Sequence, residues 1–77
     1  GERTFTLTAN AATTTLTDER LTSDGAMFFD PLTANAATEK AAGTVYVLSA
    51  DRNNGSWAVT HANNAQTDRD FRIVILG

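Results

Sequence analysis

Alternation of polar and apolar side chains predicts strands near both ends of the chain. From Arg3 to Thr8, threonines alternate with Phe5 and Leu7, and this period of two is typical of a strand with one buried face. Thr13–Thr17 predicts a second strand, which we place at the periphery because it is weakly apolar. Phe71–Leu76 predicts a closing strand that is apolar on both faces. Such a strand lies centrally between two layers or forms a contact between subunits.

A hairpin is expected in the last third of the chain. Thr44–Ser49 predicts a strong strand, and Trp57–His61 predicts a strand that returns antiparallel to it. The connection Asp51–Gly55 ends in Asn-Gly, a pair that supplies the positive φ angles of a tight turn.

The middle of the chain holds a short apolar run followed by the only helix candidate. The run Ala26–Phe29 ends at Asp30-Pro31, because proline cannot donate a ladder hydrogen bond. Thr33–Ala42 is rich in alanine, with Thr33 placed as N-cap and Gly43 just past the end. An alanine-rich bend across a sheet edge is the alternative. The predicted fold is therefore all-β: a small antiparallel sandwich or barrel of about six short strands, with one short helix or bend after Pro31, forming a single domain over residues 1–77.

One heptapeptide occurs twice. Leu7–Thr13 and Leu32–Thr38 both have the sequence LTANAAT. Two copies do not make a solenoid, which needs at least about three stacked units. The repeat is either reused turn chemistry or the trace of a duplicated strand-turn-strand unit, with reuse the stronger interpretation.

Composition narrows the classes of function. The chain has 77 residues, a formal net charge of -3, a single lysine and no cysteine. Its arginines are scattered, so no basic patch can bind a run of phosphates, and we expect no nucleic-acid partner. The longest apolar run, Ile73–Leu76, is far too short for a membrane span, and we expect no membrane partner. Without cysteine there is no disulfide and no thiolate metal site.

The small size of the chain predicts a symmetric oligomer. In so short a chain, the gain from apolar burial and the entropy cost of ordering nearly cancel, and no cross-link adds to the balance. Contact between copies is the most direct source of further burial. We expect a homotrimer whose interface is the C-terminal strand, with Phe71, Ile73, Val74, Ile75 and Leu76 as its residues.

Candidate catalytic and metal-binding groups are weak. His61 is the only histidine, and no serine lies in a G-x-S-x-G elbow, so a structural or interfacial histidine is the better interpretation. Asp68 and Asp70 lie beside arginines and predict a surface charge cluster. Asp51–Gly55 resembles a calcium loop faintly, but its glycine comes one position early and the closing glutamate is missing. We expect no catalytic residue, no metal, no cofactor and no enzymatic activity.

The aromatic residues suggest one candidate ligand site. Trp57 and Tyr46 could stack on sugar rings, with His61, Asn63 and Asn64 beside them. In a chain this short, aromatic side chains are more often the core. The core interpretation is therefore the stronger one, and the glycan platform is kept as the alternative.

Nearly the whole chain resembles a family of small phage and prophage proteins. The resemblance is carried by TFTLTANAATTTLTD, FFDPLTANAAT, GTVYV and GSWAVTHANNAQTDRDFRIVILG, which together span most of the sequence. Its most specific part is Gly55–Gly77, where THANNAQTDR precedes an aromatic residue and an apolar run. In the family the position of Trp57 is usually phenylalanine, which favours a core role. The family supplies no catalytic residues.

The resemblance implies a non-enzymatic structural protein of the virion, made in the host cytoplasm and assembled into a tailed phage particle. A tail-fibre or receptor-binding-apparatus component is the first expectation. A capsid decoration (cement) protein or a host-glycan-binding module is the alternative. The partners implied are other copies of the chain, other virion proteins and a host cell-surface glycan.

Overall fold

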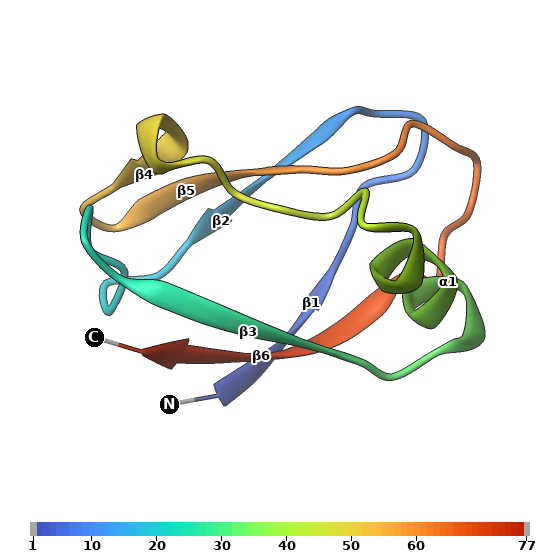
Figure 1. Ribbon diagram of the computed structural model, residues 1–77, viewed down its shortest axis with the longest axis horizontal. Helices are drawn as coiled ribbons and strands as arrows, with labels where there is room; N and C mark the ends of the chain where they lie inside the picture. The colour runs from blue at the N-terminus through green and yellow to red at the C-terminus, as the bar shows by residue number, and fades with distance from the viewer. Residues whose placement is uncertain (1, 77) are drawn as a thin grey trace.

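The computed structural model describes residues 2–76 and contains two three-stranded antiparallel sheets and one α-helix (Figure 1). The first sheet has the order β1-β6-β3, with β1 at Glu2–Thr6, β6 at Asp70–Leu76 and β3 at Ala26–Pro31. The second has the order β2-β5-β4, with β2 at Thr13–Thr17, β5 at Ser56–Thr60 and β4 at Arg52–Asn53. The helix α1 covers Ala34–Ala42, and a 3-10 turn, η1, covers Ser49–Asp51. The prediction of a mostly β fold with one short helix is confirmed.

The closing strand β6 lies in the centre of its sheet. It pairs with β1 on one side, where Phe5 faces Phe71, and with β3 on the other, where Phe29 faces Ile73. Burial alternates along it, so that every second side chain, from Phe71 to Ile75, points into the core. The face that carries Phe71, Ile73 and Ile75 is covered by the core, whereas the opposite face, with Val74 and Leu76, is partly exposed, so burial within the chain explains the apolar character of the first face alone.

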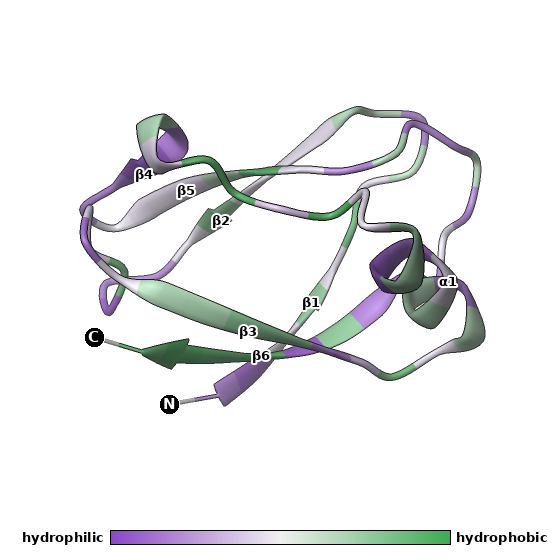
Figure 2. Ribbon diagram, in the orientation of Figure 1, coloured by the Kyte–Doolittle hydropathy of each residue, from purple (hydrophilic) through white to green (hydrophobic). Residues whose placement is uncertain are grey.

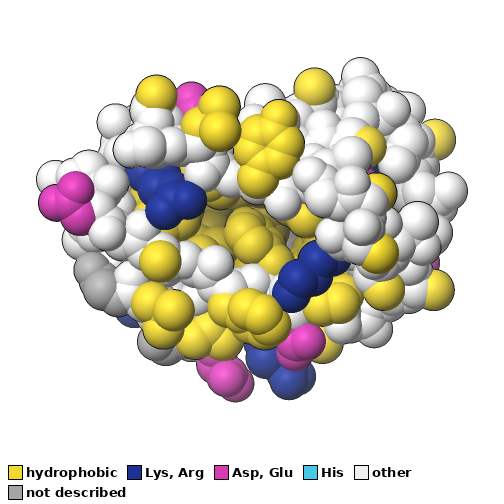
Figure 3. Space-filling view, in the orientation of Figure 1, with side chains coloured by type: hydrophobic (Ala, Val, Ile, Leu, Met, Phe, Trp, Pro, Cys, Tyr) yellow, Lys and Arg dark blue, Asp and Glu magenta, His cyan; other side chains and the backbone are white. Residues whose placement is uncertain are grey.

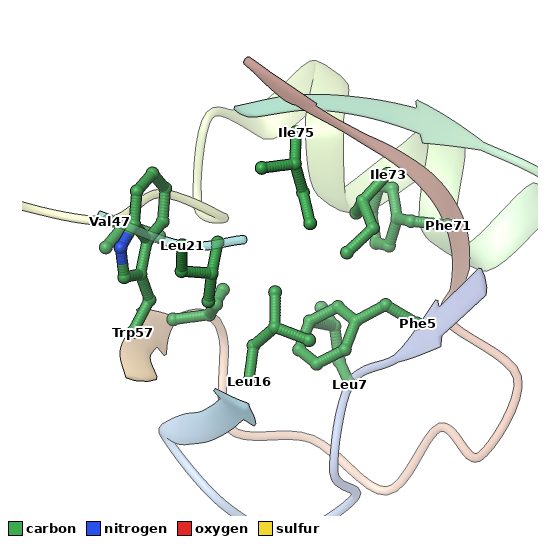
Figure 4. Packing of buried hydrophobic residues seen from close by; sticks show 11 residues of the cluster. Phe5, Leu7, Leu16, Leu21, Val47, Trp57, Phe71, Ile73 and Ile75 are labelled. Atoms are coloured by element: carbon green, nitrogen blue, oxygen red, sulfur yellow. The ribbon is translucent and has the colours of Figure 1, made fainter. Parts of the chain in front are cut away.

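The core lies between the two sheets. Figure 4 shows its side chains pointing from both sheets, and from the segments that join them, toward one another. Phe29 packs edge-on against Phe71, with ring centroids 5.8 Å apart. Figure 2 shows where hydrophobic residues lie along the chain, with hydrophobic stretches on β3, on the C-terminal part of β6 and on the segment that precedes η1. The buried hydrophobic residues are Phe5, Leu7, Leu16, Leu21, Ala36, Val47, Trp57, Val59, Phe71, Ile73 and Ile75.

The helix α1 forms where the caps predicted it. The Thr33 hydroxyl accepts a hydrogen bond from the Ala36 N–H at 3.2 Å, which satisfies one of the free donors of the first turn. Gly43 ends the helix in the left-handed conformation, with φ of 72°, where glycine carries no Cβ penalty. The predicted helix is confirmed, and the alternative of a bend is wrong.

The predicted strand Thr44–Ser49 is wrong as a continuous element. Only Tyr46 pairs, through an isolated antiparallel bridge to Thr60, before the chain enters η1. Pairing resumes at Arg52, which faces Trp57. The chain therefore advances six residues while its partner strand advances three, and the three residues of η1 take up the difference.

The two LTANAAT copies flank β6 at equivalent places but differ in conformation. The Leu7 N–H donates to the Arg69 carbonyl at 3.1 Å, and the Leu32 N–H donates to the Asp70 carbonyl at 2.9 Å. After these bonds the first copy turns, with Asn10 at a positive φ of 58°, whereas the second enters α1. The same local sequence therefore serves as a turn in one place and as a helix start in the other.

Candidate functional site

The main cluster of buried polar groups surrounds Arg69, just before β6. The Arg69 side chain is 1% exposed, and its Nη1 donates to Glu39 Oε1 at 2.9 Å and to the Ala62 carbonyl at 2.7 Å. Its Nη2 donates to the Thr8 carbonyl at 3.1 Å. One guanidinium thus joins the β1–β2 connection, α1 and the segment after β5. A buried cation held in this way has both a counter-ion and hydrogen-bond acceptors, which is the usual condition for burial.

Glu39 completes the ion pair from the last part of α1. Its second oxygen accepts from the Ala62 N–H at 3.0 Å and from the Thr44 hydroxyl. Burial by itself raises the pKa of Glu39, but the hydrogen bonds from Thr44, Ala62 and Arg69 outweigh burial, and the pKa lies below its usual value. The side chain is therefore held as a carboxylate.

The hydrogen bonds of His61 fix its tautomer. Nδ1 lies 2.9 Å from the Ala62 carbonyl, which can only accept, so Nδ1 carries the hydrogen. Nε2 then accepts from the Thr14 hydroxyl at 2.7 Å, and that hydroxyl accepts from the Thr8 N–H at 2.8 Å. The 3.4 Å approach of Arg69 Nη1 to Nδ1 is consequently a contact between two donors rather than a hydrogen bond.

The cluster holds segments together and lacks the parts of a hydrolytic triad. Thr14 and His61 have the spacing of a hydroxyl and a base, but the group that orients Nδ1 is a backbone carbonyl instead of a carboxylate. Both Glu39 oxygens are already engaged by Arg69, Ala62 and Thr44. We interpret Arg69, Glu39, His61 and their hydrogen-bond partners as a cluster that stabilises the fold, and we call it the Arg69 cluster below.

A crevice of about 290 Å³ lies beside the Arg69 cluster, between α1 and the segment that precedes β6. Across its rim, the Asn35 amide donates to Gln66 Oε1 at 3.0 Å and to Asp68 Oδ1 at 2.7 Å. Alanine methyls and neutral polar side chains provide most of its wall. The lining residues are Asn35, Thr38, Glu39, Ala42, Thr44, Ala62, Asn64, Gln66 and Arg69.

The candidate glycan platform is not assembled as predicted. Trp57 is 1% exposed, and its indole N–H donates to the Thr22 carbonyl at 3.1 Å, so its ring cannot stack on a sugar. The core interpretation of Trp57 is the correct one. His61 is buried in the Arg69 cluster. Tyr46, Asn63 and Asn64 remain exposed, and Asn64 lies at the crevice.

The predicted interface residues divide between the two faces of β6. Phe71, Ile73 and Ile75 are buried in the chain's own core, which corrects their assignment to a contact between copies. Val74 is half-buried and Leu76 is 53% exposed, both on the opposite face.

Apolar side chains of β3 continue this opposite face of β6. Phe28, which faces Val74, is 51% exposed, and Ala26 faces Leu76. We call Ala26, Phe28, Val74 and Leu76 the outer strip.

Charges near β6 also differ from the prediction. Asp68 and Asp70 accept hydrogen bonds from Asn35 and Thr6, whereas Arg69 between them points inward. The predicted surface charge cluster is therefore wrong for Arg69.

A surface ion cluster lies instead at Asp18. This carboxylate pairs with Arg20 at 2.7 Å and with Arg3 at 3.4 Å. The hydrogen bonds from Arg20 hold the pKa of Asp18 well below its usual range.

Sequence reasoning missed the pairing of Glu39 with Arg69. Glu39 precedes a lysine in an alanine-rich helix, and Arg69 lies between two aspartates, so each has a nearer apparent partner. The available signal was the long polar segment from Thr60 to Arg69, which contains neither glycine nor proline. Backbone groups in such a segment need partners, and side chains must supply some of them.

Comparison with protein-family models, with curated proteins and with solved structures finds no match to this chain. Within residues 2–76, no three histidine, aspartate or glutamate side chains are grouped so that they could hold a metal ion. In the same part of the chain, no helix has the length and apolar character needed to cross a bilayer.

Proposed function

We propose that this chain is a non-enzymatic structural protein of a tailed-phage virion, a component of the tail fibre or receptor-binding apparatus that assembles as a symmetric homo-oligomer. The two facing sheets support a small β-sandwich as its architecture. The family resemblance of the sequence supports the virion role, and the outer strip supports assembly. A capsid decoration protein is the alternative place on the particle.

The outer strip is the observation that carries the assembly proposal. Phe28 and Leu76 each leave about half of their side-chain surface exposed, and Val74 joins them across paired strands. Apolar side chains that adjoin one another on a sheet face favour contact with another protein surface. The trimer expected from the sequence would bury this strip between copies.

The test is sedimentation equilibrium at micromolar concentration for the unmodified chain and three variants. The unmodified chain is expected to sediment as a trimer, and Phe28→Ser or Leu76→Ser is expected to shift the population toward monomer. Leu48→Ser is the matched control, because Leu48 is 58% exposed but lies outside the strip. A folded monomer of the unmodified chain, or equal shifts in all three variants, contradicts the assembly proposal.

The place on the particle is tested separately. Immunogold electron microscopy of intact particles is expected to label the tail. Label on the head supports decoration instead, and particles without label contradict a virion role.

The crevice favours glycan binding as a second candidate function. Asn35, Asn64 and Gln66 present amides, which pair well with sugar hydroxyls, and its volume suits a single sugar residue. Saturation-transfer NMR with a panel of monosaccharides is the test, with Gln66→Ala expected to abolish transfer. Equal transfer to Gln66→Ala and to the unmodified chain contradicts this site.

A further inference from the structure

Strand β3 has one unpaired edge. Among residues 2–76 it pairs with β6 alone, and β6 separates it from β1. Along the free edge, side chains contact the carbonyls of Gly25 and Phe29. Because backbone groups alternate sides along a strand, the N–H and carbonyl of Met27 lie on the same edge, between those two contacts.

Two cations stand at the ends of this edge. Arg52 Nη1 donates to the Gly25 carbonyl at 2.8 Å, and Lys40 Nζ donates to the Phe29 carbonyl. Within residues 2–76, neither cation forms an ion pair with a carboxylate. Figure 3 shows this arrangement from outside as a hollow with hydrophobic side chains on its floor and basic side chains at both ends.

Both cations keep donors for a further partner. Arg52 uses Nε and Nη2 on the Val47 carbonyl, at 3.3 and 2.8 Å, and Nη1 on Gly25. A guanidinium has five N–H groups, so with respect to residues 2–76 one hydrogen on Nη1 and one on Nη2 remain to bind a carboxylate. Lys40 donates one hydrogen bond to Phe29 and lies over the Phe28 ring at 4.0 Å, and two of its N–H groups have no hydrogen-bond acceptor among residues 2–76.

We propose that the free edge of β3 accepts an extended acidic segment of a partner protein as an added strand. The segment would pair with Met27 and place one carboxylate on Arg52 and another on Lys40. Gly25 and Phe29 are four positions apart, about 13 Å along a strand. The best segment therefore carries two acidic residues four positions apart, with an apolar residue midway that faces the hollow.

The same cations select against other occupants. A neutral strand would cover Arg52 and Lys40 without giving them a counter-charge, and this costs binding energy. Pairing with β3 of a second copy, centred on Met27, would bring Lys40 of one copy to Arg52 of the other. An acidic segment of another protein is thus the occupant that the charges favour.

The experiment is a peptide titration. Three capped seven-residue peptides carry glutamate, glutamine or lysine at positions 2 and 6 and valine at position 4. Binding is followed by the emission of Trp57, because Arg52 lies over its ring at 4.7 Å. The amide shifts of Met27 and Phe29 give a second measurement by NMR.

The glutamate peptide is expected to bind saturably, to weaken as salt rises, and to bind at least about tenfold tighter than the glutamine peptide. Lys40→Gln and Arg52→Gln are each expected to reduce this preference. Arg72→Gln is the matched control, because Arg72 is an exposed cation on β6. Arg52→Lys keeps the positive charge and is expected to keep the preference for glutamate. The NMR spectrum of each variant shows whether it is folded, so a loss of preference caused by unfolding is recognised.

Equal affinity for the glutamate and glutamine peptides overturns the proposal, as does the absence of binding by any peptide. Shifts of Met27 and Phe29 that grow with protein concentration alone, and that persist in the Leu76→Ser variant whose outer strip is disrupted, would identify a second copy as the occupant of the free edge and also overturn the proposal. The Leu76→Ser variant separates this inference from the proposed self-assembly. Its affinity for the glutamate peptide is expected to be unchanged, whatever its oligomeric state.

Discussion

The Arg69 guanidinium donates to the Glu39 carboxylate over 2.9 Å, between side chains that are both buried and 30 positions apart in the sequence. This bond ties α1 to the segment before β6. Through the carbonyls of Thr8 and Ala62, the same guanidinium also holds the β1–β2 connection and the segment after β5. The Arg69 cluster therefore links the connections at this end of the fold to one another.

Removal of one charge of this pair is expected to be costly. Glu39→Gln leaves Arg69 buried without its counter-ion, and we expect the free energy of unfolding to fall by about 3–5 kcal/mol. Urea unfolding followed by the emission of Trp57, the only tryptophan, measures the change.

The control for this prediction is the same substitution at the surface. Glu19 is exposed and forms no ion pair within residues 2–76, so Glu19→Gln is expected to leave stability within about 0.5 kcal/mol of the unmodified chain. The double replacement Glu39→Leu with Arg69→Met removes both charges and is expected to cost less than Glu39→Gln. Similar losses for Glu19→Gln and Glu39→Gln would contradict the account of the Arg69 cluster.

Acid is expected to weaken the fold through Glu39. The pKa of Glu39 is lower in the folded chain than its usual value of 4.5, so the unfolded chain binds more protons between the two values. Stability from this residue is complete above the unfolded pKa and is lost as the pH falls through the folded pKa. Unfolding free energies measured at a series of pH values should fall less steeply below pH 4.5 for Glu39→Gln than for the unmodified chain. Asp18, whose pKa is also lowered, is present in both forms and therefore contributes equally to both slopes. Parallel slopes for the two forms would contradict the prediction.

The two LTANAAT copies provide a test of capping with the same local sequence in two conformations. In the second copy, Thr33 caps α1 through its hydroxyl, which also donates to the Asp68 carbonyl. In the first copy, Thr8 uses only backbone groups in its described hydrogen bonds. Thr33→Ala is expected to cost about 1 kcal/mol, whereas Thr8→Ala is expected to stay within about 0.5 kcal/mol. Thermal unfolding of the two variants measures this, and equal losses would show that the hydroxyl of Thr33 is not the cause.

Local chemistry was enough to predict several elements of the fold. Thr33 and Gly43 bound α1 because capping depends on a few neighbouring residues. The Asn-Gly pair forms a turn as expected, but the predicted connection Asp51–Gly55 is too long, because Arg52 and Asn53 pair with Trp57 and Ser56, and only Gly55, at a φ of 84°, takes a positive angle. The apolar run predicted the strand β6, and Phe71, Ile73 and Ile75 share one of its faces as expected, but that face is buried in the chain's own core and not at the predicted contact between copies.

Features that depend on distant partners could not be predicted. Arg69 and Glu39 are ordinary charged residues until the fold brings α1 beside the segment before β6. The divergence of the LTANAAT copies has the same origin, because Leu7 follows an edge strand that turns into the second sheet, whereas Leu32 precedes a helix. The segment Val45–Leu48 has the alternation of a strand, and Val47 is indeed buried while Tyr46 and Leu48 are exposed. The pattern does not show that the chain from Tyr46 to Arg52 is three residues longer than the part of β5 that it faces, a difference that η1 takes up.

Because η1 accounts for this difference in length, its deletion is expected to produce a defined strand register. Deletion of Ser49–Asp51 would join Leu48 to Arg52 and bring both arms into one register, with Leu48 facing Ala58 between the existing pairs Tyr46–Thr60 and Arg52–Trp57. The Tyr46–Thr60 pair exchanges both backbone hydrogen bonds, at 2.9 and 2.8 Å, so a pair two positions along does the same. We therefore expect the amides of Leu48 and Ala58 to become protected from hydrogen exchange in the variant. The Thr60 amide is already bonded and should be unchanged. Exchange at Leu48 and Ala58 as fast as in the unmodified chain would contradict the register that we infer.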